Sequence, residues 1–315
     1  MRSLLRPILR RLMPRRSSRR PEIRLPAPGS PELHLRHERS DDARQLVSQL
    51  CRFRTLDSET FRGWLSRLRE PWRPHRKLWE WAYICQALDE RGMLRPGRRG
   101  LAFAVGAEPL PSLFASMGCE IVATDLAADD ERRTPWERTG QWVGARDALN
   151  RRGLCDGAEF AERVRFRPVD MNELPDDLAG FDFTWSSCSF EHCGTLELGL
   201  RFLERQMSCL QPGGVAVHTT EFNLSSNSAT VESGAYAIYR LRDIEAVVHR
   251  LQQSGHRAEP LELDVGAHAL DRHVDAPPYR DFPEVDLGTV RHLRLDLNGF
   301  ASSSIGLIVT KGGPQ

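Results

Sequence analysis

Residues 100–125 read GLAFAVGAEPLPSLFASMGCEIVATD, and this stretch decides the fold. An apolar run at 101–105 stops at Gly106, a helical pattern follows at 110–117, and a second apolar run at 121–124 ends on Asp125. This order predicts a strand, a tight turn, a helix and a parallel strand. In such a βαβ unit the helix N-terminus lies beside the turn and the acid that closes the second strand. We therefore expect a nucleoside-cofactor site, with Asp125 accepting hydrogen bonds from a ribose.

The remainder of the chain after this unit alternates apolar runs with helical patterns. The predicted strands lie at 164–169, 181–187, 215–220, 261–265 and 305–309. The predicted helices lie at 141–151, 196–210 and 241–251. Strands that alternate with helices indicate an α/β fold, in which a mostly parallel sheet carries helices on both faces.

The segment before this domain divides into two parts. Residues 1–40 are rich in Arg and Pro, and the first twenty carry eight arginines and no acid. Three interpretations of this leader stay open: a disordered segment, a basic amphipathic helix on an anionic membrane surface, or a targeting peptide. Residues 41–94 carry apolar residues at helical spacing, including Leu46, Val47, Leu50 and Phe53. We expect this part to be a helical extension that covers the sheet of the domain at 95–315.

Composition narrows the class of protein. The chain has 315 residues, of which 40% are hydrophobic and 28% charged, as in ordinary globular proteins. Seven cysteines without a C-x-x-C pair predict neither a disulfide framework nor a zinc site, and they favour a reducing cytoplasm. Beyond its leader the chain is mildly acidic, which argues against nucleic acid as a partner. We expect a cytoplasmic protein whose leader is the candidate for peripheral contact with a membrane.

A turn before the predicted strand at 215–220 points to a family. Residues 210–214 read LQPGG, and this turn combines with Gly106, Asp125 and an Asp170 that closes the third strand. Together these features resemble the class I S-adenosylmethionine-dependent methyltransferases over roughly residues 95–312. The resemblance implies a Rossmann-like sheet of seven strands, mostly parallel with an antiparallel last strand, and S-adenosyl-L-methionine as cofactor.

A looser likeness concerns the segment after the fourth strand. Residues 185–187 read WSS and residues 190–192 read FEH, which is similar to small-molecule and sugar methyltransferases of bacterial glycan assembly. The chain also departs from the family at its first turn. Where the family has three alternate glycines, this chain has Ala104, Gly106 and Glu108, and Ala102 stands in the place of an acid. Glu108 either replaces that acid beside the cationic methionine part of the cofactor or is a first-turn acid that the helix dipole favours.

The resemblance assigns cofactor contacts to the carboxyl ends of the strands, where ligands bind in open parallel sheets. Asp125 would bind the ribose, Asp170 the adenine amine and Met171 the adenine ring, while Ser187 would border the methyl group. The predicted cofactor-binding residues are Gly106, Ala107, Glu108, Asp125, Leu126, Asp170, Met171 and Ser187.

Two residues after the fourth strand are the candidates for catalysis. His192 is the first choice for a base that removes the proton of an acceptor hydroxyl, since its unperturbed pKa lies near 6.5, and Glu191 lies beside it. The alternative is that His192 only caps the following helix. His218, within an apolar run, is expected to be a core histidine.

Two insertions are expected to form a cap over the acceptor. They span 224–239 and 266–303, and the second contains the pattern H-x-x-D-x-H-x-D at 268–275. The pattern fits polar contacts with the acceptor, ordinary loop polarity or a divalent metal, and we assign no metal ligand. The predicted acceptor-binding residues are Glu221, Asn223, His268, Asp271 and His273.

These features favour methyl transfer from S-adenosyl-L-methionine to an oxygen of a glycan or another small hydroxylated acceptor. An NAD-type oxidoreductase is one alternative, although the chain lacks G-x-G-x-x-G in its first turn. A non-catalytic protein that binds the cofactor for scaffolding is another. The oligomeric state is left open.

Overall fold

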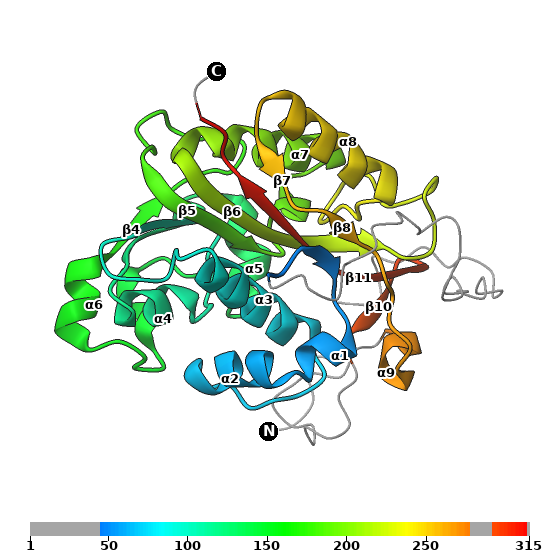
Figure 1. Ribbon diagram of the computed structural model, residues 1–315, viewed down its shortest axis with the longest axis horizontal. Helices are drawn as coiled ribbons and strands as arrows, with labels where there is room; N and C mark the ends of the chain where they lie inside the picture. Colours follow the sequence, from blue (N-terminus) through cyan, green and yellow to red (C-terminus); the bar gives the residue numbers. More distant parts are fainter. Residues whose placement is uncertain (1–44, 278–291, 314–315) are drawn as a thin grey trace, which may run out of the picture.

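The protein is built around a twisted sheet with helices on both faces (Figure 1). The computed structural model describes residues 45–277 and 292–313. The predictions for the leader at 1–40 and for part of the second insertion therefore lie outside the described residues.

Five parallel strands form the main part of the sheet. They are β2 (Arg99–Ala102), β3 (Glu120–Asp125), β4 (Val164–Pro168), β5 (Phe181–Ser187) and β6 (Leu210–Asn223). Their order in space is β4-β3-β2-β5-β6, and β11 (Phe300–Thr310) follows β6 as an antiparallel strand. The Rossmann-like, mostly parallel sheet with an antiparallel last strand is confirmed, but within the described residues it has eleven strands instead of the predicted seven, because short additional strands join its far edge. The order in which successive strands are added reverses at β2: β3 and β4 lie on one side of it, and β5 and β6 on the other. Ligands are therefore expected at the carboxyl ends of β2, β3 and β5.

The far edge of the sheet differs from the sequence prediction. The segment around Leu46 and Leu50 was expected to be helical, but it forms the short strand β1 (Ser48–Leu50). This strand pairs antiparallel with β11, and β8 (Leu261–Glu262) pairs parallel with β1. β7 (Arg257–Ala258) pairs with the end of β11. The predicted strand at 261–265 is thus reduced to β8 and separated from β11, because the N-terminal segment occupies the place beside it.

The reason for this error is the burial of β1. All three of its residues are buried, and the Ser48 hydroxyl oxygen accepts a hydrogen bond of 3.0 Å from the Ile308 amide. A strand buried on both faces needs no alternation of apolar and polar residues. Four apolar residues at helical spacing therefore could not distinguish the two structures.

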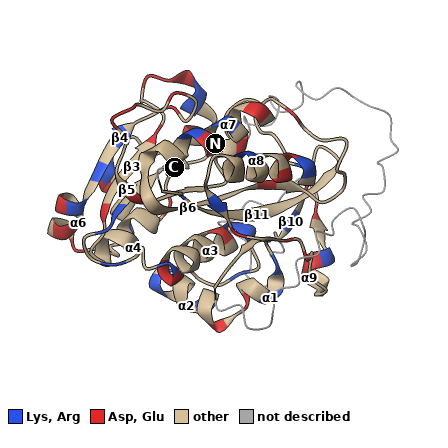
Figure 2. Ribbon diagram, turned by 45° about the horizontal axis from the view of Figure 1, so that its top comes forward, with Lys and Arg blue, Asp and Glu red and all other residues tan. Residues whose placement is uncertain are grey.

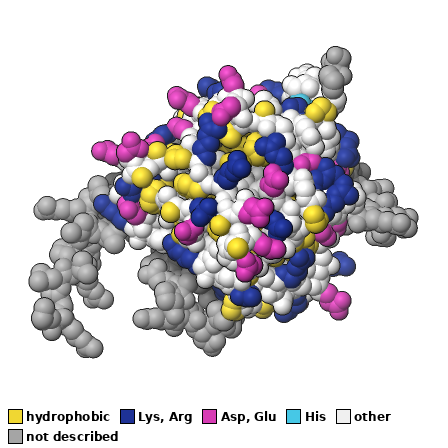
Figure 3. All heavy atoms as spheres, turned by 90° about the vertical axis from the view of Figure 1, so that its left-hand side faces the viewer, with side chains coloured by type: hydrophobic (Ala, Val, Ile, Leu, Met, Phe, Trp, Pro, Cys, Tyr) yellow, Lys and Arg dark blue, Asp and Glu magenta, His cyan; other side chains and the backbone are white. Residues whose placement is uncertain are grey.

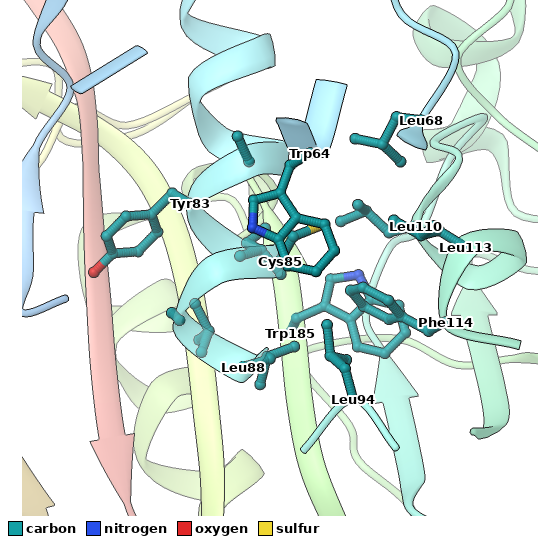
Figure 4. Close-up of a cluster of buried hydrophobic side chains, with 14 of the residues drawn as sticks. Trp64, Leu68, Tyr83, Cys85, Leu88, Leu94, Leu110, Leu113, Phe114 and Trp185 are labelled. Carbon is teal, nitrogen blue, oxygen red and sulfur yellow. The ribbon is translucent and has the colours of Figure 1, made fainter. Parts of the chain in front are cut away.

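Helices cover the two faces of the sheet in separate groups (Figure 1). One group contains α1 (Phe53–Leu56), α2 (Glu59–Arg67), α3 (Arg76–Glu90), α4 (Leu110–Ser116) and α6 (Gly157–Arg163). The other contains α7 (Leu196–Arg205) and α8 (Leu241–Gln253). Each helix group packs on the sheet through its own hydrophobic cluster of buried residues. In the first, Figure 4 shows Trp185 of β5 packed against Phe114 of α4, with ring centroids 5.1 Å apart.

The connection after β3 also differs from the sequence prediction. A helix was expected at 141–151, but the chain forms α5 (Thr134–Arg138) earlier and only a 3₁₀ turn at Arg146–Asn150. The intervening segment is held by tertiary contacts instead, because Trp142 donates a hydrogen bond of 3.2 Å to the Leu126 carbonyl. The last small elements are α9 (Ala269–Arg272), β9 (Val274–Asp275) and β10 (Arg294–Leu297).

Charged residues of both signs occur throughout the described part of the fold (Figure 2). Figure 2 shows both signs on helices and strands throughout the fold, and on the face in Figure 3 they are interspersed. That face therefore presents no separate basic patch of the kind that binds nucleic acid. None of the helices in residues 45–277 and 292–313 combines the length and apolar character needed to span a bilayer.

Candidate functional site

The glycine turn and the first acid meet as the sequence predicts. The Gly106 amide donates a 2.9 Å hydrogen bond to Oδ2 of Asp125, and the Leu126 amide donates a 2.8 Å bond to Oδ1. Gly106 has a φ of +52°, a conformation that favours glycine. Burial raises the pKa of Asp125 to about 6, although both amide bonds favour the ionised form. Asp125 is thus fixed beside the turn with lone pairs left for a ligand.

Glu108 follows the glycine turn by two residues, and its side chain points into the protein. Trp185 Nε1 donates a 2.8 Å hydrogen bond to its Oε1, and the side chain is buried. Burial raises the pKa of Glu108 to about 8, so the group is mostly protonated at pH 7 without a ligand. A cation placed beside it would favour the ionised form. Ala107, its neighbour in the predicted set, is exposed.

The segment at 126–144 crosses this edge of the sheet. Arg132 forms a 2.7 Å ion pair with Asp170, which was expected to bind the adenine amine. A Cβ atom on Gly106 would lie 2.7 Å from the Gln141 carbonyl oxygen, so the same segment approaches the glycine turn. Met171 is buried in the hydrophobic cluster on the α7 side of the sheet. The structure therefore brings Gly106, Asp125 and Asp170 to one edge, beneath a connecting segment.

A second group of polar residues surrounds Glu80 of α3, a carboxylate with no exposed surface. Lys77 Nζ lies 2.7 Å from its Oε2, and Arg76 Nη1 lies 3.1 Å from its Oε1. The Ser187 hydroxyl and the Cys188 thiol donate to Glu80 over 3.1 Å and 3.0 Å. Burial opposes ionisation, but the two cations and their hydrogen bonds outweigh it and lower the pKa of Glu80 to about 2.

Sequence reasoning missed Arg76, Lys77 and Glu80. A signal existed, because Lys77 is one of only two lysines in the chain and all three residues share the first turns of one helix. Charges three and four positions apart are, however, typical of solvent-exposed ion pairs on helices. Nothing in the spacing shows that this helix face is buried against β5 and β11.

Arg76 also connects α3 to β6. Its Nη2 forms an ion pair with Oε1 of Glu221, a predicted acceptor residue, and the Ser302 hydroxyl donates a 2.7 Å bond to Oε2 of Glu221. Arg76 Nη1 lies 3.3 Å from the Cys188 thiol sulfur. The carboxyl end of β5, the end of β6, the start of β11 and the start of α3 therefore meet in one buried polar cluster.

Both predicted catalytic residues border this cluster. Thr220 donates a 2.9 Å hydrogen bond to Oε2 of Glu191, whereas Oε1 of Glu191 has no hydrogen-bond partner in the described part of the chain. Burial, and then the neighbouring Glu221, raise the pKa of Glu191 to about 8. His192 Nδ1 lies 2.7 Å from the Ala235 carbonyl oxygen, which assigns the ring proton to Nδ1 and leaves a lone pair on Nε2. Burial lowers the pKa of His192.

The other predicted acceptor residues have local partners. The Asn223 side chain accepts hydrogen bonds from the Ser225 and Ser226 amides and donates to the Ala229 carbonyl, so it organises the insertion at 224–239. His218, expected in the core, is buried there with Nδ1 2.8 Å from the Ser186 hydroxyl. Burial lowers the pKa of His218 to about 3.

Side chains of the pattern at 268–275 contact residues around α9 and Phe53. Asp271 Oδ1 accepts a 2.7 Å hydrogen bond from the Phe53 amide, and the His268 ring stacks on the Phe53 ring at 3.9 Å. His273 is exposed, and Asp275 lies 2.9 Å from Nδ1 of His292. The described structure does not gather these side chains into a metal site, and contact with an acceptor stays a prediction.

One group in the described residues has the geometry to hold a metal. Ligand atoms of Cys188, Glu191 and Glu221 lie within 4.8 Å of one another. The guanidinium of Arg76 contacts two of these residues, Cys188 and Glu221. Arg76 thus already supplies the positive charge that a metal ion would bring to this position.

Comparisons with known proteins return methyltransferases. No family model matches the chain. A stretch of 85 residues is 34% identical to a malonyl-[acyl-carrier protein] O-methyltransferase of Erwinia pyrifoliae and covers 27% of this chain. The chain spans about a third, 31%, of the length of that curated relative.

Similar solved structures also include methyltransferases. A putative sarcosine dimethylglycine methyltransferase of Galdieria sulphuraria is 16% identical, with a TM-score of 0.40 over 56% of this chain and 60% of that chain. The 1,6-didemethyltoxoflavin-N1-methyltransferase of Burkholderia thailandensis, with bound S-adenosylhomocysteine, is 15% identical, with a TM-score of 0.39 over 72% and 75%. An S-adenosylmethionine-dependent methyltransferase of Mesorhizobium loti is 13% identical, with a TM-score of 0.41 over 73% and 97%.

Proposed function

We propose that this chain is an S-adenosyl-L-methionine-dependent methyltransferase that acts on an oxygen of a glycan or another small hydroxylated acceptor. The observation that carries the proposal is the edge at which Gly106 and Asp125 are hydrogen-bonded, in a sheet whose last strand runs antiparallel. An acid at the tip of the second parallel strand is suited to ribose hydroxyls. The antiparallel β11 favours this cofactor over NAD, whose doubly wound sheet is mostly parallel.

The residues at this edge fit the cofactor. Asp125 and Glu108 are carboxyl groups whose pKa burial has raised, so hydrogen-bond donors or a cation would favour their ionised forms. Asp125 would hold the ribose, and Glu108 would face the cationic methionine part. Asp170 would receive the adenine amine after exchange of its present partner, Arg132. When bound, the cofactor supplies a methyl group on a sulfonium.

The polar cluster is the proposed place of the acceptor. Ser187 ends β5 and Cys188 follows it, and Glu191, His192 and Glu221 lie next to them. These buried groups orient an acceptor and exclude water, which is the main requirement for an in-line displacement. Either Oε1 of Glu191 or Nε2 of His192 is available to accept a proton. The insertion at 224–239 carries hydroxyl and amide groups suited to a glycan or a small polyol.

Binding measurements test this proposal. S-adenosylhomocysteine is expected to bind in calorimetry and to raise the melting temperature, whereas NAD does neither. Glu108→Ala is expected to weaken that binding, with Glu162→Gln on the exposed end of α6 as the control. Binding of NAD alone would support the oxidoreductase instead.

A second candidate is a protein that binds the cofactor without turnover. It is favoured by the first turn, in which Ala104 and Glu108 stand where the family has glycines. Transfer of a labelled methyl group to a small-molecule or glycan pool, read by mass spectrometry, separates an enzyme from a scaffold.

A further inference from the structure

Glu191 and Glu221 are neighbouring carboxyl groups in unlike surroundings. Both oxygens of Glu221 have partners, Arg76 at Oε1 and the Ser302 hydroxyl at Oε2. Glu191 has one oxygen held by Thr220, and its other oxygen has no hydrogen-bond partner within the described residues. Glu191 is nevertheless only 1% exposed. The imidazole Nε2 of His192 lies 4.0 Å from this oxygen, which is beyond hydrogen-bond distance. In the ionised form of Glu191 a buried oxygen without a donor is costly, so a ligand group that donates a hydrogen bond would be bound favourably here.

The contacts of Arg76 keep its guanidinium paired with Glu221. Its Nη1 lies 3.1 Å from Glu80 Oε1 and 3.3 Å from the Ser304 hydroxyl. Glu80 is in turn held in its ionised form by Lys77 at 2.7 Å. Arg76 therefore cannot turn to Glu191 without leaving a buried carboxylate unpaired, which is strongly unfavourable.

We propose that Glu191 accepts the proton of the acceptor, that Arg76 and Glu221 are positioning residues that keep it available, and that the reacting group is an uncharged hydroxyl. This inference rests on the proposed methyl transfer. The acceptor atom forms its bond to the methyl carbon while the bond from that carbon to sulfur breaks, and the bonding electrons stay on sulfur. The acceptor proton passes to Oε1 of Glu191. A carboxylate acceptor brings no such proton, and it would be repelled by Glu191 in the ionised form that accepts the proton.

The surroundings of Glu191 set its pH dependence. The titratable and charged groups around it are Arg76, Lys77 and Glu80 of α3, Cys188 after β5, Glu221 of β6, and His192, Cys193 and Tyr239. Burial and Glu221 favour the protonated form of Glu191, so its pKa lies near 8. Ionised Glu191 becomes more abundant as pH rises, and the rate of transfer is expected to rise with it up to about pH 8.

Carboxyl-carbon NMR of the full chain with ¹³C-labelled glutamate tests the proton assignment without an acceptor. The signal that disappears in Glu191→Gln is expected to titrate near pH 8 in the unmodified chain. In Glu221→Gln that signal is expected to titrate at least about one pH unit lower, because a neighbouring negative charge is gone. Glu162→Gln, on the exposed end of α6, is the control that leaves it unchanged. A Glu191 signal that titrates near the ordinary value of about 4.3, or one that Glu221→Gln does not move, overturns the proposal.

Transfer from methyl-labelled cofactor to defined probes tests the acceptor class. Methyl glycosides and phenols are expected to accept methyl groups, whereas benzoate and acetate are not. Glu191→Gln should lower the rate about 10²–10⁴-fold while the affinity for S-adenosylhomocysteine stays unchanged. Transfer to carboxylates alone, no transfer to any probe by a chain that binds the cofactor, or full activity of Glu191→Gln each contradicts the inference. Failure to bind S-adenosylhomocysteine instead overturns the proposed function and leaves the NMR titration to decide the proton assignment.

Discussion

The two halves of the candidate site are built in different ways. At the cofactor edge, Gly106 and Asp125 are 19 residues apart in the sequence and meet through a single βαβ unit. In the acceptor cluster, Glu80 receives a hydrogen bond from Ser304, and 224 positions separate the two residues. A local motif can be recognised from a sequence, whereas a cluster assembled from α3, β5, β6 and β11 becomes visible only in the fold. The comparison predicts that the acceptor half depends most strongly on the integrity of the whole sheet.

Removing Glu80 is expected to have the largest effect. Glu80→Ala leaves Arg76 and Lys77 without their shared buried counter-ion, which costs about 3–5 kcal/mol of unfolding free energy. Urea unfolding followed by circular dichroism measures this loss. The control Glu162→Gln should change the unfolding free energy by no more than about 0.5 kcal/mol. A loss as small as that in Glu80→Ala would mean that the cluster is solvated.

Glu108 should make stability fall as pH rises. Its folded pKa of about 8 lies above the usual value of 4.5, so its stabilising contribution is complete below about pH 4.5 and is lost as pH rises through 8. Between pH 6 and 7.5, the unfolding free energy of the unmodified chain is expected to fall by about 2 kcal/mol relative to Glu108→Gln. Denaturant titrations at the two pH values measure the difference. Parallel stability curves would show that Glu108 is ionised in the folded chain.

Asp125 tests the cofactor edge directly. Asp125→Asn removes the charge and keeps one acceptor oxygen, so only one of the Gly106 and Leu126 amides retains its partner. Affinity for S-adenosylhomocysteine is expected to fall about tenfold, or about 1.4 kcal/mol, because hydrogen bonds to charged acceptors are the stronger ones. Calorimetry measures it, and an affinity equal to that of the unmodified chain would remove Asp125 from the ribose site.

The smallest effect is expected at the segment that crosses the cofactor edge. Arg132 is half exposed where it pairs with Asp170, so Arg132→Ala should cost less than about 1 kcal/mol of stability. The same change frees Asp170 for the adenine amine, and affinity for S-adenosylhomocysteine should rise about threefold, which is within that 1 kcal/mol. Weaker binding in calorimetry would instead show that Arg132 itself supports the cofactor.

The sequence predicted most of the sheet because its central strands are short apolar runs between clear turns. β3, β5 and β11 contain the apolar runs at 121–124, 181–187 and 305–309, and β2 begins two residues before the run at 101–105 and ends within it. The far edge escaped prediction because β1 has only three residues and its place depends on β11, far along the chain. Pairing between distant segments leaves no local signal.

The candidate site likewise contains residues that the sequence singles out and residues that only the fold reveals. Asp125, Glu191 and Glu221 could be singled out because each lies at or just beyond the predicted carboxyl end of a strand. Arg76 and Lys77 were missed because the charges on a helix do not reveal which neighbour they face. His268 and Asp271 were singled out by residue type, yet hydrogen bonds and ring stacking with Phe53 and the α9 backbone occupy them.

The pairing of β1 with β11 has a consequence for the order of folding. Gln49 pairs with Gly306, so the two partners are 257 positions apart in the sequence. Ser302 and Ser304, which complete the cluster around Glu221 and Glu80, belong to that same late strand. Pairings of such long sequence separation form late in folding. Until β11 is in place, the cluster that we propose for the acceptor therefore lacks both the Ser302 and the Ser304 hydroxyl.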